Sequence, residues 1–153
     1  MSRVSTLARI VLPIILLASV ATPALADTTG GGSADLGLDA VTITSASVNG
    51  RTGVATISGT ISCSQDITDV FVATQLEQVV GRFNTIRGWG GTQVSCSAAT
   101  GSASWSVVVR ADQGKFAGGN ATVYADAYLD FCTDIECLSD YASFGPQAIR
   151  LGR

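Results

Sequence analysis

Strict alternation of apolar and polar residues is the feature that most constrains the fold of this chain. From Ala55 to Cys63 and again from Ala121 to Phe131, an apolar or small residue occupies every second position, with polar or tyrosine residues between them. A repeat of two places the apolar side chains on one face of a β-strand and the polar side chains on the other. No window shows a sustained repeat of 3.6 residues, so we predict no long helix.

Further β-signals recur at short intervals, separated by turn-forming residues such as Asn49-Gly50. The expected strands are a run around Val41 and Ile43, then 54–63, 69–78, 79–87, 93–97, 102–110, 121–131 and 148–151. Gly88-Trp89-Gly90-Gly91 is expected to form a loop. About seven to eight short antiparallel strands predict an all-β domain, an immunoglobulin-like β-sandwich.

The beginning of the chain has the pattern of a secretory signal peptide, which we assign to residues 1–26. Arg3 and Arg9 supply positive charge, an apolar run follows, and Ala24-Leu25-Ala26 has the small-x-small form of a cleavage site. The alternative is a retained membrane anchor, but the apolar run is short for a transmembrane helix. We therefore expect a secreted protein, extracellular or associated with the cell envelope, without a mature membrane anchor.

The remainder is expected to form one domain. Residues 27–38 are rich in glycine and are interpreted as a flexible leader. Residues 39–153 are interpreted as the Ig-like domain, which we expect to be monomeric.

Four cysteines lie in the expected mature chain: Cys63, Cys96, Cys132 and Cys137. An even number in an exported chain predicts two disulfides, and three pairings are possible. Proximity in sequence favours Cys132–Cys137, which leaves Cys63–Cys96. A zinc site is the alternative, but the chain has no histidine and no Cys-x-x-Cys pair.

The charge balance argues against some partners. The chain has nine Lys and Arg against twelve Asp and Glu, a formal net charge of −3, and loss of Arg3 and Arg9 with the signal peptide would make it more acidic. Binding to DNA, RNA or anionic membranes depends on clustered cations. We therefore expect no nucleic-acid partner.

The sequence offers little for catalysis, and we predict no enzymatic activity and no cofactor. Serine and cysteine hydrolases usually need a histidine base, which is missing. A group of acidic residues is the remaining possibility: Asp126, Asp130, Asp134, Glu136 and Asp140. They could serve a carboxylate-based hydrolase or bind Ca²⁺, but we expect a solvated acidic surface. The ring between Cys132 and Cys137 could also display its loop as protease inhibitors do.

Three aromatic residues are candidate ligand contacts. Trp89 is flanked by glycines, and Tyr124 and Tyr128 share the polar face of the 121–131 strand. Glycans and other flat ligands stack on exposed rings. The alternatives are that Trp89 folds back over a sheet edge and that the tyrosines make ordinary cross-strand pairs.

Ala55–Cys63, followed by Gln93-Val94-Ser95-Cys96 and by Gly119–Ala125, resembles a family of uncharacterised secreted Ig-like domains from actinobacteria. The resemblance covers most of 40–151. It implies the fold and the exported setting, and no activity.

A second segment, Cys132–Asp140, is similar to the late cysteine ring of neocarzinostatin-type apoproteins, which are secreted seven-stranded sandwiches that carry an enediyne chromophore. The chain departs from them at the other bridge, whose cysteines are 33 positions apart here and enclose a short loop there. No binding residue is carried over from that family.

The expected function is that of a secreted, non-enzymatic Ig-like module that binds a protein, glycan or small-molecule partner through its surface or loop ends. A carrier of a small apolar or aromatic ligand, as in the neocarzinostatin type, is one alternative. A carboxylate-based hydrolase is the other.

Overall fold

The computed structural model describes residues 36–82 and 84–152 and contains strands but no helix in that part of the chain. The predicted signal peptide and most of the predicted leader lie outside the described residues. The strands are β1 (Leu38–Val48), β2 (Ala55–Cys63), β3 (Ile67–Val80), β4 (Asn84–Cys96), β5 (Ser102–Ala111), β6 (Gly119–Cys132) and β7 (Cys137–Leu151). The predicted all-β class is confirmed, with seven strands.

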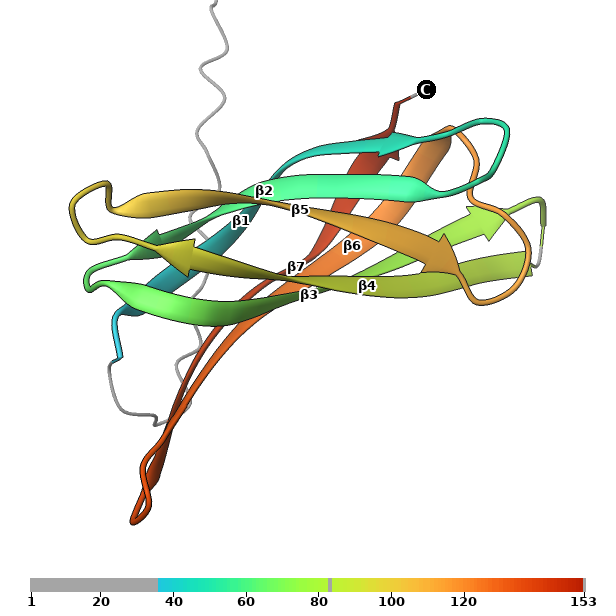
Figure 1. Cartoon of the computed structure of the whole chain (residues 1–153). Coiled ribbons are helices and arrows are strands. Elements are labelled where there is room, and N and C mark those ends of the chain that lie inside the picture. Colours follow the sequence, from blue (N-terminus) through green and yellow to red (C-terminus); the bar gives the residue numbers. More distant parts are fainter. Residues whose placement is uncertain (1–35, 83, 153) are drawn as a thin grey trace, which may run out of the picture.

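The strands form one sheet in the order β1-β2-β5-β4-β3-β6-β7, and every neighbouring pair is antiparallel. The two ends of this order approach each other, because Val48 N–H donates to the carbonyl of Gly152 at 2.8 Å. The sheet therefore curls into a nearly closed body around its core (Figure 1).

Strands β1, β2 and β5 form one part of this sheet and β3, β6 and β7 form another, and β4 joins the two parts. It pairs with β3 along most of its length and with β5 at Gly88 and Trp89. The result is a continuous sheet in place of two separate ones.

The core is built from the inward positions that the alternation predicts. Ala55, Ile57, Gly59, Ile61 and Cys63 of β2 are all buried. The inward residues of β5 and β6 pack against them: Trp105, Val107, Val109, Ala121, Val123, Ala125, Ala127 and Leu129 are buried as well. The predicted inward faces of β2 and β5 and most of that of β6 are thus found in the structure.

Both disulfides have the predicted pairing. Cys63–Cys96 connects the ends of β2 and β4, which flank β5, and Cys132–Cys137 closes the hairpin between β6 and β7. The first bridge differs from that of antibody domains, which joins strands B and F across the layers. From the loop lengths, cross-linking stabilises the fold by about 4 kcal/mol for the long loop and about 2 kcal/mol for the short one.

The predicted strands in residues 79–97 are found, but their boundaries and the loop between them were wrong. The chain turns after Val80, and β4 then runs without a break through Gly88-Trp89-Gly90-Gly91, which is not a loop. The glycines have another purpose. A Cβ at Gly88 or Gly90 would collide with the β5 backbone at Arg110 or Val108. They let β4 and β5 approach closely. The same glycine-rich pattern is also typical of turns, so the sequence alone does not distinguish the two.

Two further predictions need correction. The last strand is longer than expected, since β7 continues from Cys137 through a cis Gly145–Pro146 peptide to Leu151. Proline is tolerated because β7 is the last strand in the order and donates fewer ladder hydrogen bonds. Phe131, predicted to face inward, is 56% exposed because β6 has left the body at that point.

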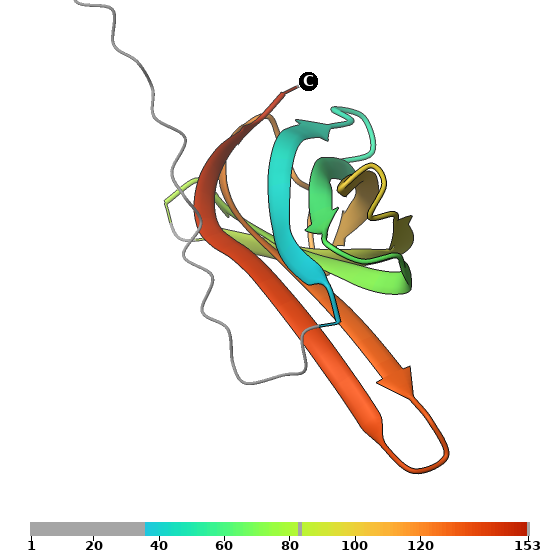
Figure 2. The ribbon, with the colours of Figure 1, turned by 90° about the vertical axis from the view of Figure 1, so that its left-hand side faces the viewer.

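The β6–β7 hairpin extends well beyond the body as a two-stranded projection, residues 129–140, which we call the arm (Figure 2). Strand β3 stops pairing with β6 at Phe71–Tyr128, whereas β7 pairs with β6 as far as Cys132–Cys137. The start of the fold lies against the arm: the N–H groups of Leu36 and Leu38 donate to Asp140. The fold therefore begins before the predicted boundary at residue 39.

Candidate functional site

The three aromatic residues singled out in the sequence lie on one surface, the outer face of β4, β3 and β6. Trp89 on β4 pairs with Gln75 on β3, which pairs in turn with Tyr124 on β6. Directly paired residues point to the same side of a sheet. Tyr128 is four residues after Tyr124 and points the same way. The structure thus brings together residues from two distant parts of the sequence.

Two more aromatic residues belong to this surface and were missed. Phe71, Tyr128 and Tyr141 form a row across β3, β6 and β7, and the rings of Tyr128 and Tyr141 are 5.0 Å apart between centroids at an interplanar angle of 45°. Phe71 was hidden in a run that is apolar on both faces. Tyr141 lies in a segment for which no strand was predicted.

We call the five residues Phe71, Trp89, Tyr124, Tyr128 and Tyr141 the aromatic face. Trp89 is 67% exposed, and Phe71, Tyr128 and Tyr141 are each about 40% exposed. Single exposed apolar residues are ordinary, but a group of them on one face is typical of a binding surface. Trp89 does not fold back over the sheet, contrary to one alternative considered from the sequence.

Small residues separate the two rows of rings. Between Phe71–Tyr128–Tyr141 and Trp89–Tyr124 lies a row in which Gly91 pairs with Ala73, Ala73 with Asp126 and Asp126 with Ser143. A Cβ at Gly91 would collide with the ring of Phe71, which therefore lies over the β4 backbone. The absence of bulk in this row keeps the ring surfaces accessible from it.

Asp126 and Arg87, two charged residues at the aromatic face, have side-chain partners. The Tyr141 hydroxyl donates to Asp126 Oδ1 at 2.7 Å, and Arg87 forms a 2.9 Å ion pair with Glu77 beside Trp89 and Gln75. Partial burial raises the pKa of Tyr141, and the hydrogen bond to Asp126 raises it further. Partial burial also raises the pKa of Tyr128, with a second contribution from the Asp126 charge. Both phenols are therefore neutral at ordinary pH.

The acidic residues grouped by the sequence do not converge. Asp126 pairs with Ser143 on the outer face, whereas Asp140 pairs with the buried Leu129 and is itself buried. Asp140 accepts hydrogen bonds from Leu36, Leu38 and Tyr141 N–H groups, which is a structural role. Asp126 and Asp130 are four residues apart on one strand, about 13 Å between Cα atoms. Asp134 and Glu136 lie in the turn of the arm. This arrangement does not support paired acid–base chemistry.

Within residues 36–82 and 84–152, no group of three or more Cys, Asp or Glu side chains is arranged to hold a metal ion. The same residues include no helix long and apolar enough to cross a membrane.

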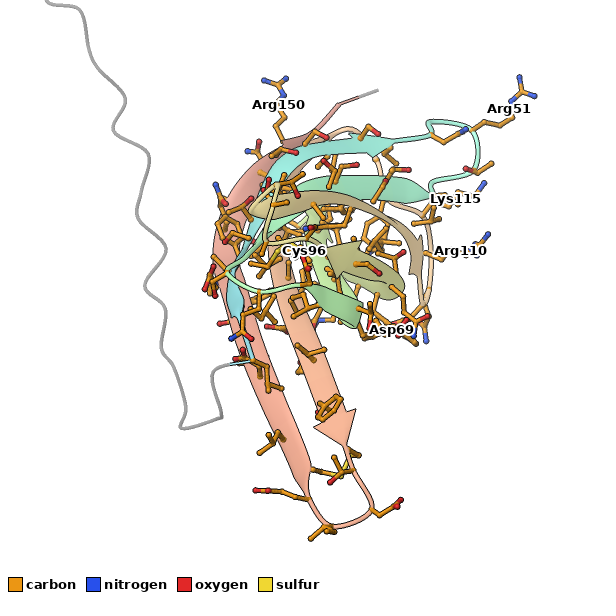
Figure 3. The ribbon with its side chains drawn as sticks, turned by 60° about the vertical axis from the view of Figure 1, so that its left-hand side comes forward. Arg51, Asp69, Cys96, Arg110, Lys115 and Arg150 are labelled. Carbon is orange, nitrogen blue, oxygen red and sulfur yellow. A yellow bond between two sulfur atoms is a disulfide. The ribbon has the colours of Figure 1, made fainter. Side chains whose placement is uncertain are left out.

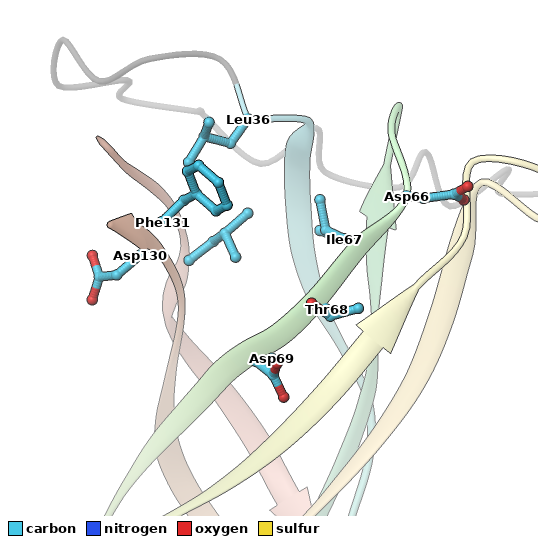
Figure 4. A pocket seen from close by; sticks show the side chains of 8 residues that line it. Leu36, Asp66, Ile67, Thr68, Asp69, Asp130 and Phe131 are labelled. Carbon is cyan, nitrogen blue, oxygen red and sulfur yellow. The ribbon is translucent and has the colours of Figure 1, made fainter. Parts of the chain in front are cut away.

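A second feature is a pocket of about 420 Å³ between the start of β3 and the end of β6 (Figure 4). Leu36, Ile67, Leu129 and Phe131 supply its apolar surface, and the remaining lining residues are Asp66, Thr68, Asp69 and Asp130. Its size satisfies what the carrier hypothesis requires. Its three carboxylates would have to be desolvated by a purely apolar ligand, which disfavours such a ligand.

Comparison of the chain with family models, curated proteins and solved structures gives no match. The two resemblances noted in the sequence therefore remain predictions, and the geometry of the aromatic face is the basis for the function proposed below.

Proposed function

We propose that this protein is a secreted, non-enzymatic, immunoglobulin-like module that binds a neutral carbohydrate through its aromatic face. The observation that carries the proposal is the gathering of five aromatic side chains, at least four of them well exposed, on the outer face of β4, β3, β6 and β7. Their exposure gives no benefit to folding, since the rings remain largely in water.

Carbohydrate fits the chemistry of this surface. One face of a pyranose ring presents C–H groups, which pack against the electron-rich face of an aromatic ring, while its hydroxyls need hydrogen-bonding groups nearby. The aromatic face supplies both: Gln75 and Asp126 lie between its rings, and Gln93 is paired with Phe71. A protein partner would also use aromatic residues, but the interleaved amide and carboxylate groups favour a ligand rich in hydroxyls.

A neutral sugar is favoured over an acidic one because the charge between the two rows of rings is negative. Asp126 lies there and accepts a hydrogen bond from the Tyr141 hydroxyl, and Arg87 is paired with Glu77. A second cation, Arg110, pairs with Trp89 at the β5 side of the face and is separated from Asp126 by β4 and β3. An acidic polysaccharide lying between the rows would therefore be repelled by Asp126.

Two features support the secreted setting. The sequence begins with a signal-peptide pattern, and the fold contains two disulfides, which persist in oxidising compartments. The strand order supports the Ig-like assignment.

The test is a titration of the purified mature protein with neutral oligosaccharides of glucose, mannose and N-acetylglucosamine, followed by tryptophan fluorescence and calorimetry. At least one series should bind, and Trp89→Ala and Tyr128→Ala should each raise Kd by about tenfold. Ile135→Ala is the control, because Ile135 is an exposed apolar residue in the turn of the arm, away from the aromatic face. Absence of binding to all three series, or equal losses with the control, would contradict the proposal.

A further inference from the structure

The pocket between β3 and β6 arises from the way the two strands separate. Their ladder ends at Phe71–Tyr128, just after Asp69, which has a left-handed backbone with φ of 58°. The β3–β4 pairing is also irregular between Ile67 and Val70. Together these features turn the start of β3 away from β6. The two strands then form a fork, with Leu36 and Phe131 along one side of the pocket and Ile67, Thr68 and Asp69 along the other (Figure 4).

Separation of the strands leaves one edge of β6 without a partner. Residues 129–132 pair with β7 on one side, but no strand in the described part of the chain pairs with them on the side of β3. An unpaired strand edge presents a row of backbone N–H and C=O groups that can accept another strand. The edge borders the pocket, since Leu129, Asp130 and Phe131 line it.

The charge around this edge has one sign. Asp66, Asp69 and Asp130 line the pocket, and Asp134 and Glu136 lie in the turn at the end of the arm. No lysine or arginine is among the residues that line the pocket. The labelled cations Arg51, Arg110, Lys115 and Arg150 lie on the body and not on the arm (Figure 3).

We infer that the fork is a second binding site, which takes an extended segment of a basic polypeptide as an added strand on the free edge of β6. The backbone of the segment pairs with residues 129–132. Its apolar side chains enter the pocket against Ile67, Leu129 and Phe131, and its lysine or arginine side chains reach Asp69 and Asp130. Backbone pairing supplies affinity, and alternate side chains supply specificity. This site is separate from the aromatic face and does not depend on the function proposed for it.

The test is an NMR titration of the mature, disulfide-bonded protein with a short peptide of alternating lysine and valine. The largest shifts should fall on the backbone amides of residues 129–132, and the affinity should decrease as salt increases. Two control peptides separate the contributions: one has glutamate in place of lysine, and one has N-methylated backbone amides. Both should bind at least about tenfold more weakly.

Variants locate the site. Asp69→Asn and Asp130→Asn should each weaken binding about fivefold, as expected for rim charges. Asp112→Asn makes the same change of charge in the loop after β5 and should have no effect. Trp89→Ala should also have no effect, which distinguishes this site from the carbohydrate surface. Shifts on the aromatic face, equal affinity for the glutamate or N-methylated peptide, or binding of a neutral apolar dye with the same shifts in place of the peptide would overturn the inference.

Discussion

The two outer faces of this sheet obey the same alternation but carry different chemistry. On β1, β2 and β5 the outward positions are mostly small hydroxyl residues, whose side chains bond to one another: Thr42 with Thr60 at 2.8 Å and Ser58 with Ser106 at 3.0 Å. We call this the hydroxyl face. On β4, β3, β6 and β7 the outward positions include the aromatic face. The hydroxyl face shows that the fold can solvate an outer surface without large rings. This contrast supports the proposal that the rings on the other side form a binding surface.

The largest expected effect is on stability, and it distinguishes two glycines. Gly59 is buried on the inner side of β2, whereas Gly91 lies on the outer side of β4, between the rings of the aromatic face. A Cβ at Gly59 would collide with the Thr42 backbone carbonyl and the Trp105 ring, whereas a Cβ at Gly91 would meet the ring of Phe71, an exposed side chain that can move. Gly59→Ala should lower the free energy of unfolding by about 3 kcal/mol, because neither neighbour can give way. Gly91→Ala should lower it by less than about 1 kcal/mol.

Urea denaturation of both variants measures this difference. Gly91→Ala should still weaken sugar binding, because it displaces Phe71. Equal destabilisation by the two substitutions would show that the aromatic face is as tightly packed as the core, and would weaken the case for a binding surface.

A smaller effect on stability is expected when the aromatic face is converted to the chemistry of the hydroxyl face. Trp89→Ser, Phe71→Thr and Tyr128→Thr should each change the free energy of unfolding by about 1 kcal/mol or less, the range of a cross-strand pair. Each should still raise the Kd for the sugar by about tenfold. A loss of several kcal/mol in denaturant melts would mean that the rings are structural.

Iodide quenching of tryptophan fluorescence compares an exposed ring of the aromatic face with a buried ring of the core, and it needs no ligand. Trp89 is 67% exposed and Trp105 is 4% exposed. We expect about half of the tryptophan emission to be quenched in the native protein, and almost none in Trp89→Ser, because iodide reaches only exposed indoles. Strong quenching that persists in Trp89→Ser would contradict the buried position of Trp105.

The sequence predicted the inside of this molecule better than its outside. Alternation in β2, β5 and most of β6 is a local signal, and it identifies the buried face because a strand exposes every second residue to the same side. The disulfides followed from the number and spacing of the cysteines. These features need no knowledge of which strands are neighbours.

The surfaces depend on that knowledge, and here the sequence was less informative. Tyr124 and Tyr128 share a strand and were identified together, but Phe71 and Tyr141 join them only through the pairing of β3, β6 and β7. The glycines around Trp89 suggested a turn because glycine is typical both of turns and of strands that approach each other closely. The fork depends on the backbone of Asp69, for which no residue pattern is diagnostic.

The smallest expected effect is the response of the two faces to alkaline pH. The pKa values of Tyr128 and Tyr141 lie above the ordinary value of 10.0, first because of partial burial and second because of Asp126. A group whose pKa is raised by folding contributes stability that is complete below its unfolded pKa and is lost as the pH rises through the folded pKa. The contribution from these tyrosines is therefore present up to about pH 10 and lost above it. The serine and threonine side chains of the hydroxyl face do not titrate in this range.

Phenolate absorbance at 295 nm should show the two raised titrations, and Asp126→Asn should shift both toward 10.0 without abolishing them, since burial remains. Unchanged titrations in that variant would mean that the Asp126 charge does not act on the rings, and the choice of a neutral ligand, which rests on that charge, would have to be abandoned.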